Sequence, residues 1–379
     1  MRRATLVVNV CAQMRPLVQI ISKPMVAPFH DGTKCFVRDL TNHVHSFEVA
    51  VLGGRERPSE LTAAQVVALH HKTGGFSPAL RENIKTLAWL IFRSRADLWH
   101  FAFAPNPRSS SAAQFARALR RVPTLQTVVS PPRSFSEPEA LLFGDIVVTQ
   151  SRWTRDQFRG AFGFRGLTAP RLEVIHPVAP AVPRPSRDSE LRLRAELGVT
   201  ADEPLLVYPG DLEMSRGSAR IAELVQAFAE QRKRGTFVFA YRNKTPGAAQ
   251  RRAQLEARLD PARVRFIADT PLIHALLASA TLILFPVEDL FGKVDIPIVL
   301  LEALRLGTPV VVSDEGPLRE LEPALRLAWN SRLWSERILS LLESTPPSAQ
   351  PDLGRHEPER AAAAYENLYA ELLGKKSDP

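Results

Sequence analysis

The chain has 379 residues, of which 45% are hydrophobic and 23% charged, and its formal net charge at pH 7 is +9. This length exceeds one ordinary hydrophobic core and favours two domains, and no apolar run approaches the length of a membrane span. The positive charge favours an anionic partner such as a nucleotide phosphate or a membrane surface, whereas the lack of any basic patch interleaved with aromatic residues argues against nucleic acid. The two cysteines, Cys11 and Cys35, are too few for a disulfide framework or a metal-ligand cluster, which favours a cytoplasmic protein.

The first half of the chain alternates short apolar runs with amphipathic segments. We interpret residues 1–16 as a loose extension instead of a targeting signal, because the segment from Met14 runs directly into a strand. Residues 55–78 are polar and irregular, so we expect a surface excursion there. The expected strands are 17–22, 47–52, 97–103, 125–129, 145–149 and 172–176, and the expected helices are 31–44, 79–93, 109–121 and 152–159.

A proline-rich stretch divides the chain, and the alternation resumes beyond it. The pattern predicts a domain over 17–180, a linker over 181–189, a second domain over 190–355 and a C-terminal helix over 356–379 that crosses back to the first domain. Strands that alternate with helices indicate an α/β protein with parallel sheets, here two doubly wound Rossmann-like domains. The carboxyl ends of both sets of strands are expected to face a central cleft.

The most informative stretch is LILFPVEDLFGKVDIPIVLLEALRLGTPVVVS, residues 282–313. It reads as a buried strand, a polar loop with Gly292, a helix that Gly307 ends, and a second buried strand. Glu302 lies in that helix, close to the sheet edge. A carboxylate beside a glycine-containing loop and a helix N-terminus suits a sugar or ribose hydroxyl next to a phosphate. Taken alone, however, Glu302 is also compatible with an ordinary exposed helix residue.

This stretch resembles the retaining, nucleotide-sugar-dependent glycosyltransferases of the GT-B fold, the family-4 or group 1 glycosyltransferases. In that family two glutamates eight positions apart precede a Gly-Thr-Pro-Val strand, as Gly307-Thr308-Pro309-Val310 does here. The resemblance implies that Glu302 holds the nucleotide ribose. Val294 occupies the position of the first glutamate, which normally contacts the transferred sugar. Either the neighbouring Asp295 serves in its place as a catalytic residue, or the loop has a different shape.

The resemblance extends to a loop after the first strand of the second domain, residues 207–217, which is similar to the family's diphosphate-binding loop. Gly210 belongs to this loop, Asp211 stands where an arginine is usual, and Arg216 stands in for a lysine. We expect compensating positive charge from Arg242, to which we also assign a catalytic role, and from Lys244. Gly292 and Lys293 offer backbone amides to the donor phosphate.

For the first domain the resemblance implies a role in acceptor binding. Gly32 and Thr33 occupy the loop after the first strand, and His100 matches a position that often faces the donor sugar, although a buried core histidine is the alternative. A basic run near one helix, Arg108 to Arg121, suggests peripheral contact with an anionic membrane, against the alternative of a solvated face.

These features predict a metal-independent enzyme without a cofactor, in which a nucleotide diphosphate sugar is the co-substrate. It would transfer a sugar, with retention of anomeric configuration, to a glycan or lipid-linked acceptor in cell-envelope polysaccharide synthesis. Two alternatives remain open: another GT-B chemistry such as epimerisation, and a catalytically silent homologue that binds nucleotide-sugar or glycan as a partner subunit. A nicotinamide-dependent dehydrogenase is disfavoured, because no G-x-G-x-x-G motif follows a strand.

Overall fold

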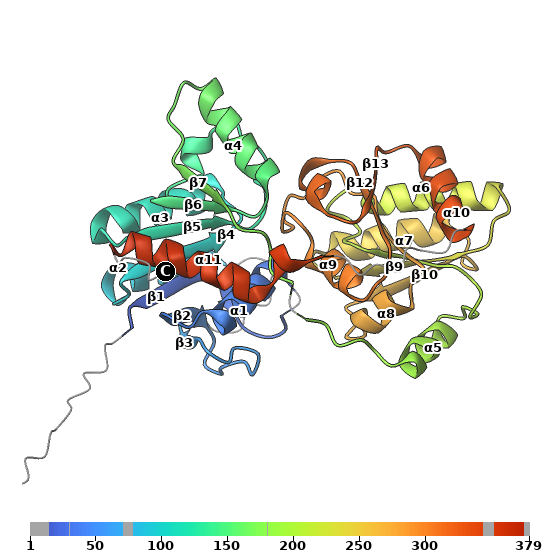
Figure 1. Cartoon of the computed structure of the whole chain (residues 1–379), viewed down its shortest axis with the longest axis horizontal. Coiled ribbons are helices and arrows are strands. Elements are labelled where there is room, and N and C mark those ends of the chain that lie inside the picture. The colour runs from blue at the N-terminus through green and yellow to red at the C-terminus, as the bar shows by residue number, and fades with distance from the viewer. Residues whose placement is uncertain (1–14, 30, 71–78, 180, 344–351, 375–379) are drawn as a thin grey trace, which may run out of the picture.

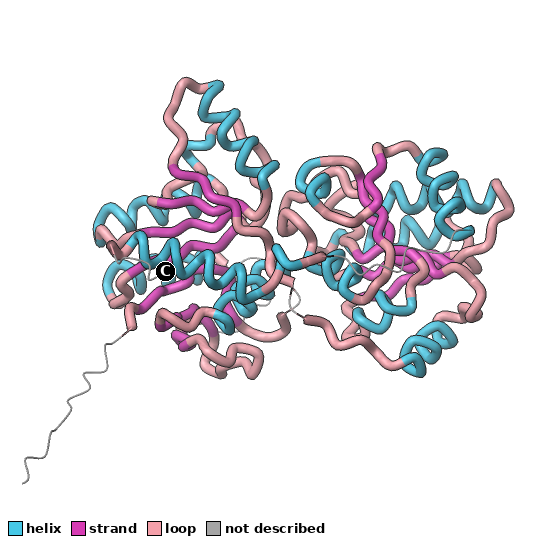
Figure 2. The backbone as a smooth tube through the Cα atoms, viewed as in Figure 1, coloured by secondary structure: helices cyan, strands magenta, loops and turns pink. Residues whose placement is uncertain are grey.

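The computed structural model describes residues 15–29, 31–70, 79–179, 181–343 and 352–374. These residues form two α/β units, each built on a parallel sheet with helices on both faces (Figures 1 and 2). The fold is therefore the predicted pair of doubly wound, Rossmann-like domains. Nearly all of the extension predicted over 1–16 lies outside the described residues.

The first sheet has seven strands in the order β3-β2-β1-β4-β5-β6-β7. Its strands are β1 (Leu17–Met25), β2 (Glu48–Gly53), β3 (Gln65–Ala68), β4 (Leu98–Phe103), β5 (Thr124–Val128), β6 (Ile146–Thr149) and β7 (Arg171–Val174). The edge strand β3 corrects the expectation of an irregular excursion over 55–78. Its sequence is short and only half-buried, so its apolar pattern is weak, and pairing with β2 determines its conformation.

The second sheet has six strands in the order β10-β9-β8-β11-β12-β13. Its strands are β8 (Leu205–Pro209), β9 (Thr236–Tyr241), β10 (Val264–Ala268), β11 (Leu282–Phe285), β12 (Val310–Ser313) and β13 (Leu325–Leu327). The two sheets therefore share one winding pattern, in which the chain order reverses between β1 and β4 and again between β8 and β11. Such reversal points leave a crevice at the carboxyl ends of the strands, where ligands bind.

Helices on the two faces of the first sheet bury alternate residues of the same strands. Val18 and Ile20 of β1 pack on one face with α1 (Gly32–His43) and α11 (Pro358–Leu372), whereas Ile21 packs on the other face. That other face carries α2 (Leu80–Phe92), α3 (Pro107–Arg120) and α4 (Arg152–Phe164). The C-terminal helix α11 thus completes the core of the first domain (Figure 1).

The helices of the second domain enclose one continuous core. They are α5 (Arg187–Glu196), α6 (Gly217–Glu230), α7 (Gly247–Arg258), α8 (Ile273–Ser279), α9 (Ile298–Arg305) and α10 (Ser331–Glu343), with short 3-10 turns at Gly316–Glu320 and Gly354–His356. Gly307, at a φ of +79°, ends α9 as predicted.

The chain crosses between the domains twice, and the two crossings are bonded to each other. The His356 Nδ1 atom lies 2.8 Å from the Pro177 carbonyl, and the Ala179 amide donates to the His356 carbonyl at 2.9 Å. His356 is fully buried, and burial lowers its pKa to about 4. Both crossings therefore form one packed junction beside the cleft.

Candidate functional site

A cavity of about 530 Å³ lies between the two domains, at the carboxyl ends of both sheets. Its walls come from the loop after β1 in the first domain and from the segments after β8, β9, β10 and β11 in the second. Most of the predicted site residues line it, namely Gly32, Thr33, Gly210, Arg242, Lys244, Gly292, Lys293 and Glu302. The structure thus brings together residues that are almost 270 positions apart in the chain.

A buried ion cluster forms one part of the cavity wall. The Asp211 Oδ2 atom lies 2.9 Å from the Lys244 Nζ and 3.1 Å from the Lys293 Nζ, and all three side chains are nearly inaccessible. Arg242 lines the same wall and acts electrostatically on Asp211. Three cations against one carboxylate leave an excess of positive charge, as an anion-binding site requires.

The backbone around Asp211 is fixed by the tyrosine that precedes it. The Tyr208 hydroxyl donates to the Asp211 carbonyl at 2.9 Å, so its ring lies under the turn. A Cβ atom at Gly210 would come within 2.3 Å of that ring, which explains why glycine is needed at this position. The sequence predicted Gly210 in the donor loop, and the packing supplies a local reason for it.

The charges of this cluster depend on each other. Burial alone would raise the pKa of Asp211, but Lys293, Lys244 and Arg242 together hold that pKa below its usual value. Burial lowers the pKa of Lys244 to about 8, although Asp211 opposes the shift. Asp211 therefore remains ionised at neutral pH, and Lys244 loses its proton as pH rises through about 8.

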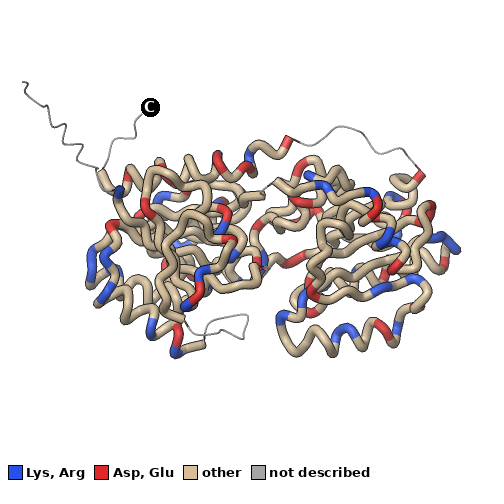
Figure 3. Tube along the Cα trace, turned by 90° about the horizontal axis from the view of Figure 1, so that it is seen from below, with Lys and Arg blue, Asp and Glu red and all other residues tan. Residues whose placement is uncertain are grey.

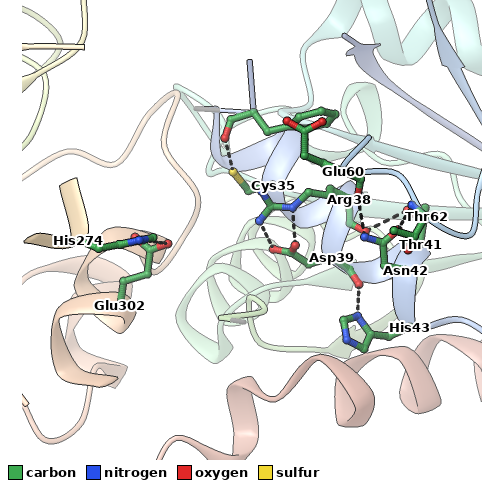
Figure 4. Close-up of polar contacts among 11 residues, drawn as sticks. Cys35, Arg38, Asp39, Thr41, Asn42, His43, Glu60, Thr62, His274 and Glu302 are labelled. Carbon is green, nitrogen blue, oxygen red and sulfur yellow. Dashed lines mark hydrogen bonds and ion pairs between the residues drawn. The ribbon is translucent and has the colours of Figure 1, made fainter. Parts of the chain in front are cut away.

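Glu302 is paired with a histidine that the sequence analysis did not single out. The His274 Nε2 atom lies 3.3 Å from Glu302 Oε1, and both residues line the cavity (Figure 4). The hydrogen bond to Glu302 raises the pKa of His274. The one sequence signal for His274 is its place in the first turn of α8, just after β10, at the sheet edge that also carries Glu302.

The first domain supplies the opposite wall through the N-terminal end of α1. Asp31 caps this helix by accepting from the Thr33 amide at 3.0 Å, and its other oxygen accepts from Lys23 at 2.7 Å. Gly32 lies against Val294, whose Cγ1 would be 3.0 Å from a Cβ at that position. Val294, which stands where the resemblance places a glutamate, therefore packs an apolar side chain against the start of α1.

Figure 4 shows that His274 and Glu302 lie across the cleft from Cys35 and Arg38 of α1. Burial raises the pKa of the Cys35 thiol to about 12, so the thiol is neutral. The Arg38 guanidinium donates two hydrogen bonds to the Asp39 carboxylate, at 2.6 and 3.0 Å. This wall therefore presents one guanidinium and one neutral thiol to the cavity.

The structure contradicts the assignment of His100 to the donor site. His100 is fully buried beneath α11, where its ring nitrogens lie 2.7 Å from the Tyr369 hydroxyl and 2.7 Å from the Thr127 hydroxyl. Burial lowers its pKa to about 3, so the imidazole is neutral. His100 is a core residue that joins the C-terminal helix to the first sheet, which was the alternative interpretation.

Asp295 does not reach the cavity either, so it does not replace the missing glutamate in this structure. It is fully buried and accepts a hydrogen bond from the Ser151 hydroxyl of the first domain at 2.6 Å. Burial raises its pKa to about 7, which the Ser151 and Thr154 hydroxyls offset only in part. Glu320 reinforces the same contact, since it accepts from the Trp153 amide at 2.7 Å. Two carboxyl groups of the second domain thus bind the N-terminal end of α4 in the first.

Arg216 lies outside the cavity wall, with an exposed side chain, and its backbone amide donates to Glu288 at 2.7 Å. The neighbouring Arg220 points into the domain, where its guanidinium lies 5.0 Å from the Trp329 ring and 3.4 Å from Glu315. Lys244 and Lys293, and not Arg216, therefore lie next to Asp211, although the resemblance of residues 207–217 to a diphosphate-binding loop had implied this role for Arg216.

Among the described residues, no group of three or more His, Cys, Asp or Glu side chains is arranged to hold a metal ion. In the same part of the chain, no helix has both the length and the hydropathy to cross a membrane.

Two facing Rossmann-like domains with an anion-binding cleft between them define the GT-B class of fold. Residues 203–344 match the family model of the group 1 glycosyl transferases. The second domain is therefore similar to the group 1 glycosyl transferases, and the predicted resemblance is confirmed.

Solved structures with the same fold cover nearly the whole chain. The structure of HepE from Anabaena in complex with UDP and glucose is 15% identical, with a TM-score of 0.69 over 93% of this chain and 99% of that one. A glycosyltransferase from Rickettsia africae is 12% identical, with a TM-score of 0.71 over 96% and 100% of the two chains. WaaG, a glycosyltransferase involved in lipopolysaccharide biosynthesis, is 16% identical, with a TM-score of 0.61 over 94% and 97%. A comparison with curated protein sequences gave no match.

Proposed function

We propose that the cleft binds a nucleotide diphosphate sugar and transfers its sugar to a glycan or lipid-linked acceptor with retention of anomeric configuration. The observation that carries this proposal is the convergence of Lys244, Lys293 and Arg242 on one wall of the cavity that Glu302 also lines. A diphosphate needs several cations in a partly buried site, and a ribose needs a carboxylate that accepts from its hydroxyl groups. UDP in the complex with HepE supports the same choice of donor class.

In this proposal the cations act on the leaving group. As the bond between the anomeric carbon and the donor oxygen breaks, its electron pair stays on the diphosphate, where negative charge develops. Lys244, Lys293 and Arg242 stabilise that charge without reorganisation, because Asp211 already holds the two lysines in place. Glu302, paired with His274, positions the ribose, so the diphosphate is brought to the cations.

Retention is supported by the state of the cavity carboxylates. Among the described residues that line the cavity, each carboxylate already has a partner: Asp31 with Lys23, Asp211 with two lysines, Asp269 with Asn243 and Glu302 with His274. None of these four is left as an unpaired base to deprotonate the acceptor. The acceptor oxygen would then form its bond on the face from which the diphosphate leaves, and its proton would pass to the departing phosphate oxygen.

The first test is thermal stabilisation by UDP, GDP and ADP and by their sugar conjugates, without added metal. A ligand that binds only the folded chain raises its stability with the logarithm of ligand concentration over the dissociation constant. Glu302→Ala should weaken the binding of the best nucleotide roughly tenfold to a hundredfold, because a hydrogen bond to a charged group is lost. Glu256→Ala, an exposed change on α7 of the same domain, is the control.

Stabilisation by one nucleotide that is reduced in Glu302→Ala but not in Glu256→Ala would identify the donor base and support the assigned site. No stabilisation by any nucleotide would contradict the proposal. Donor binding without turnover on any acceptor would instead favour a silent binding subunit.

A further inference from the structure

The exposed face of α2 and α3 carries large apolar side chains that the protein core does not use. On α2, Leu80 is 75% exposed and Phe92 76%, and Ile84 is also more than half exposed. These residues are spaced by multiples of four, so they form one stripe along the helix. On α3, Phe115 and Leu119 form a second such stripe. The two helices pack against each other on the face of the first sheet opposite α1 and α11.

The segment of the chain that contains these two helices has an excess of positive charge. Residues 79–121 contain eight Lys and Arg against two Asp and Glu, whereas the whole chain of 379 residues has a net charge of +9. In Figure 3, Lys and Arg segments gather at the end of the first domain away from the second domain. The two carboxylates are engaged within the domain: Glu82 bonds to His70 at 2.7 Å, and Asp97 accepts from the Leu17 amide at 2.8 Å.

Several of these arginines are available to an external anion. Arg81, Arg93 and Arg95 are exposed, and no carboxylate of the described residues forms an ion pair with them. Arg117 and Arg120, by contrast, are used internally, since both donate to backbone carbonyls. Arg117 and Arg120 therefore stabilise the domain, whereas the three exposed arginines face solvent.

We propose that this face of α2 and α3 docks on an anionic phospholipid bilayer. The combination of features selects this partner: apolar side chains enter the boundary between headgroups and acyl chains, while arginines beside them meet the lipid phosphates. A nucleic acid would satisfy the arginines but would leave Leu80, Phe92 and Phe115 against water or phosphate. An acidic protein surface would need apolar pockets for the same side chains.

The position of the two helices gives the docking a consequence for the reaction. Both helices begin at the carboxyl edge of the first sheet, because α3 follows β4 directly and α2 runs antiparallel to the strands. This is the edge that opens into the cavity. The starts of α2 and α3 would therefore place one side of a docked bilayer next to the cleft, on the side that the proposed function gives to the acceptor, whereas Phe92 and Arg93 at the end of α2 lie at the opposite edge of the sheet. This last step rests on the proposed function, whereas the docking itself does not.

The test is co-sedimentation of the full chain with phosphatidylcholine vesicles that contain or lack phosphatidylglycerol, at physiological ionic strength. The wild type should bind only the vesicles with phosphatidylglycerol. Reversing the charge in Arg81→Glu, Arg93→Glu and Arg95→Glu together should lower partitioning roughly a hundredfold or more. Phe92→Ser with Phe115→Ser should lower it roughly tenfold, because less apolar area enters the interface.

Phe164→Ser is the matched control, since Phe164 is 92% exposed but lies at the end of α4 and not on this face. It should leave partitioning unchanged, and the melting temperatures of all variants should stay close to that of the wild type. Equal binding by wild type and variants, or no wild-type binding to anionic vesicles, would overturn the proposal. So would a dimer in solution that the same variants dissociate, because the face would then join two copies of the chain.

Failure of the docking and failure of the proposed function give different results. Stabilisation by a nucleotide with no vesicle binding would remove the docking surface and keep the donor site. Vesicle binding with no response to any nucleotide would do the reverse.

Discussion

Two buried carboxylates on the cleft side of the second domain behave in opposite ways. Asp211 is 4% exposed and Asp295 is 0% exposed, so both are removed from water. The pKa of Asp211 is held below its usual value, whereas the pKa of Asp295 is raised to about 7. The difference lies in the partners, because Asp211 faces two lysines and Asp295 faces hydroxyl groups. Burial therefore does not decide whether a carboxylate is charged; the nearest groups do.

The two regions suit different tasks for this reason. A charged cluster at the cavity wall can exchange part of its internal ion pairing for a ligand phosphate. A carboxyl group near its neutral form, bonded to the N-terminal end of a helix of the other domain, suits a contact that holds the domains together. Lys293 and Asp295 are only two positions apart, so a single loop serves both tasks.

The largest expected effect is that of Asp211→Asn. It leaves Lys244 and Lys293 nearly buried without their carboxylate, which should lower the free energy of unfolding by about 3–5 kcal/mol. Urea denaturation at pH 7 measures the change. Asp269→Asn is the control, because Asp269 lines the same cavity but its carboxylate accepts only from the Asn243 side-chain amide among the described residues.

Added nucleoside diphosphate sharpens this test. If the lysines form the diphosphate site, the ligand should stabilise Asp211→Asn more than the wild type, since it restores negative charge between them. An equal loss of unfolding free energy in Asp211→Asn and Asp269→Asn would show that Asp211 stabilises the fold no more than another carboxylate of the cavity does. If no nucleoside diphosphate stabilises Asp211→Asn, the ion cluster is not part of the donor site.

At alkaline pH, Asp295→Asn should raise the free energy of unfolding, whereas Asp211→Asn lowers it. The folded-state pKa of about 7 exceeds the ordinary value of 3.8, so the folded chain keeps a proton that the unfolded chain releases between these values. This contribution to stability is complete below pH 4 and is lost as pH rises through 7. Relative to the wild type, Asp295→Asn should therefore gain about 2–4 kcal/mol between pH 4 and pH 8.

Unfolding midpoints in urea at four pH values between 4 and 8 measure this gain. Asp269→Asn again serves as a control, because its carboxylate lies on the cavity wall and not in the contact with α4. Parallel pH profiles for the wild type and Asp295→Asn would mean that Asp295 is charged in the folded chain. The contrast with Asp211 would then disappear.

A smaller effect is expected on the pH dependence of donor binding. Lys244 has a pKa of about 8, so in the free protein it loses its proton as pH rises through 8, while the diphosphate stays ionised. The dissociation constant of the nucleoside diphosphate should rise up to about tenfold between pH 8 and pH 9. Calorimetric titrations at pH 7, 8 and 9 measure it.

Lys244→Met should bind more weakly at pH 7 and should show a flat profile. Lys293→Met is the matched comparison, since it removes the other lysine of the pair but leaves Lys244 to titrate. A profile in Lys244→Met that still falls above pH 8 would assign the titration to another group.

The sequence predicted the second domain better than the first, for a physical reason. Gly210 and Lys293 lie in loops that follow short strands, and Glu302 lies in α9, directly after one of these loops, so the order of elements is enough to bring them to one edge. The prediction for His100 was wrong because His100 lies inside β4 and not at its end, and its side chain bonds to Tyr369, almost 270 residues later in the chain. Asp295 failed because one residue of difference along a loop turned it from the cavity to the domain contact. His274 was missed because its pairing with Glu302 depends on the packing of α8 against α9.

The smallest effect is expected for Arg216→Ala, although the loop comparison placed this arginine in the donor site. Its side chain is exposed, and its backbone amide makes the bond to Glu288, which alanine retains. The free energy of unfolding should change by less than about 0.5 kcal/mol, and the affinity for nucleoside diphosphate should match the wild type. Calorimetric titration of Arg216→Ala and Lys244→Met with the same nucleoside diphosphate compares the two losses of affinity. An equal loss of affinity in both variants would mean that Arg216 closes over the diphosphate once it binds, and the anion site would then extend beyond the cluster around Asp211.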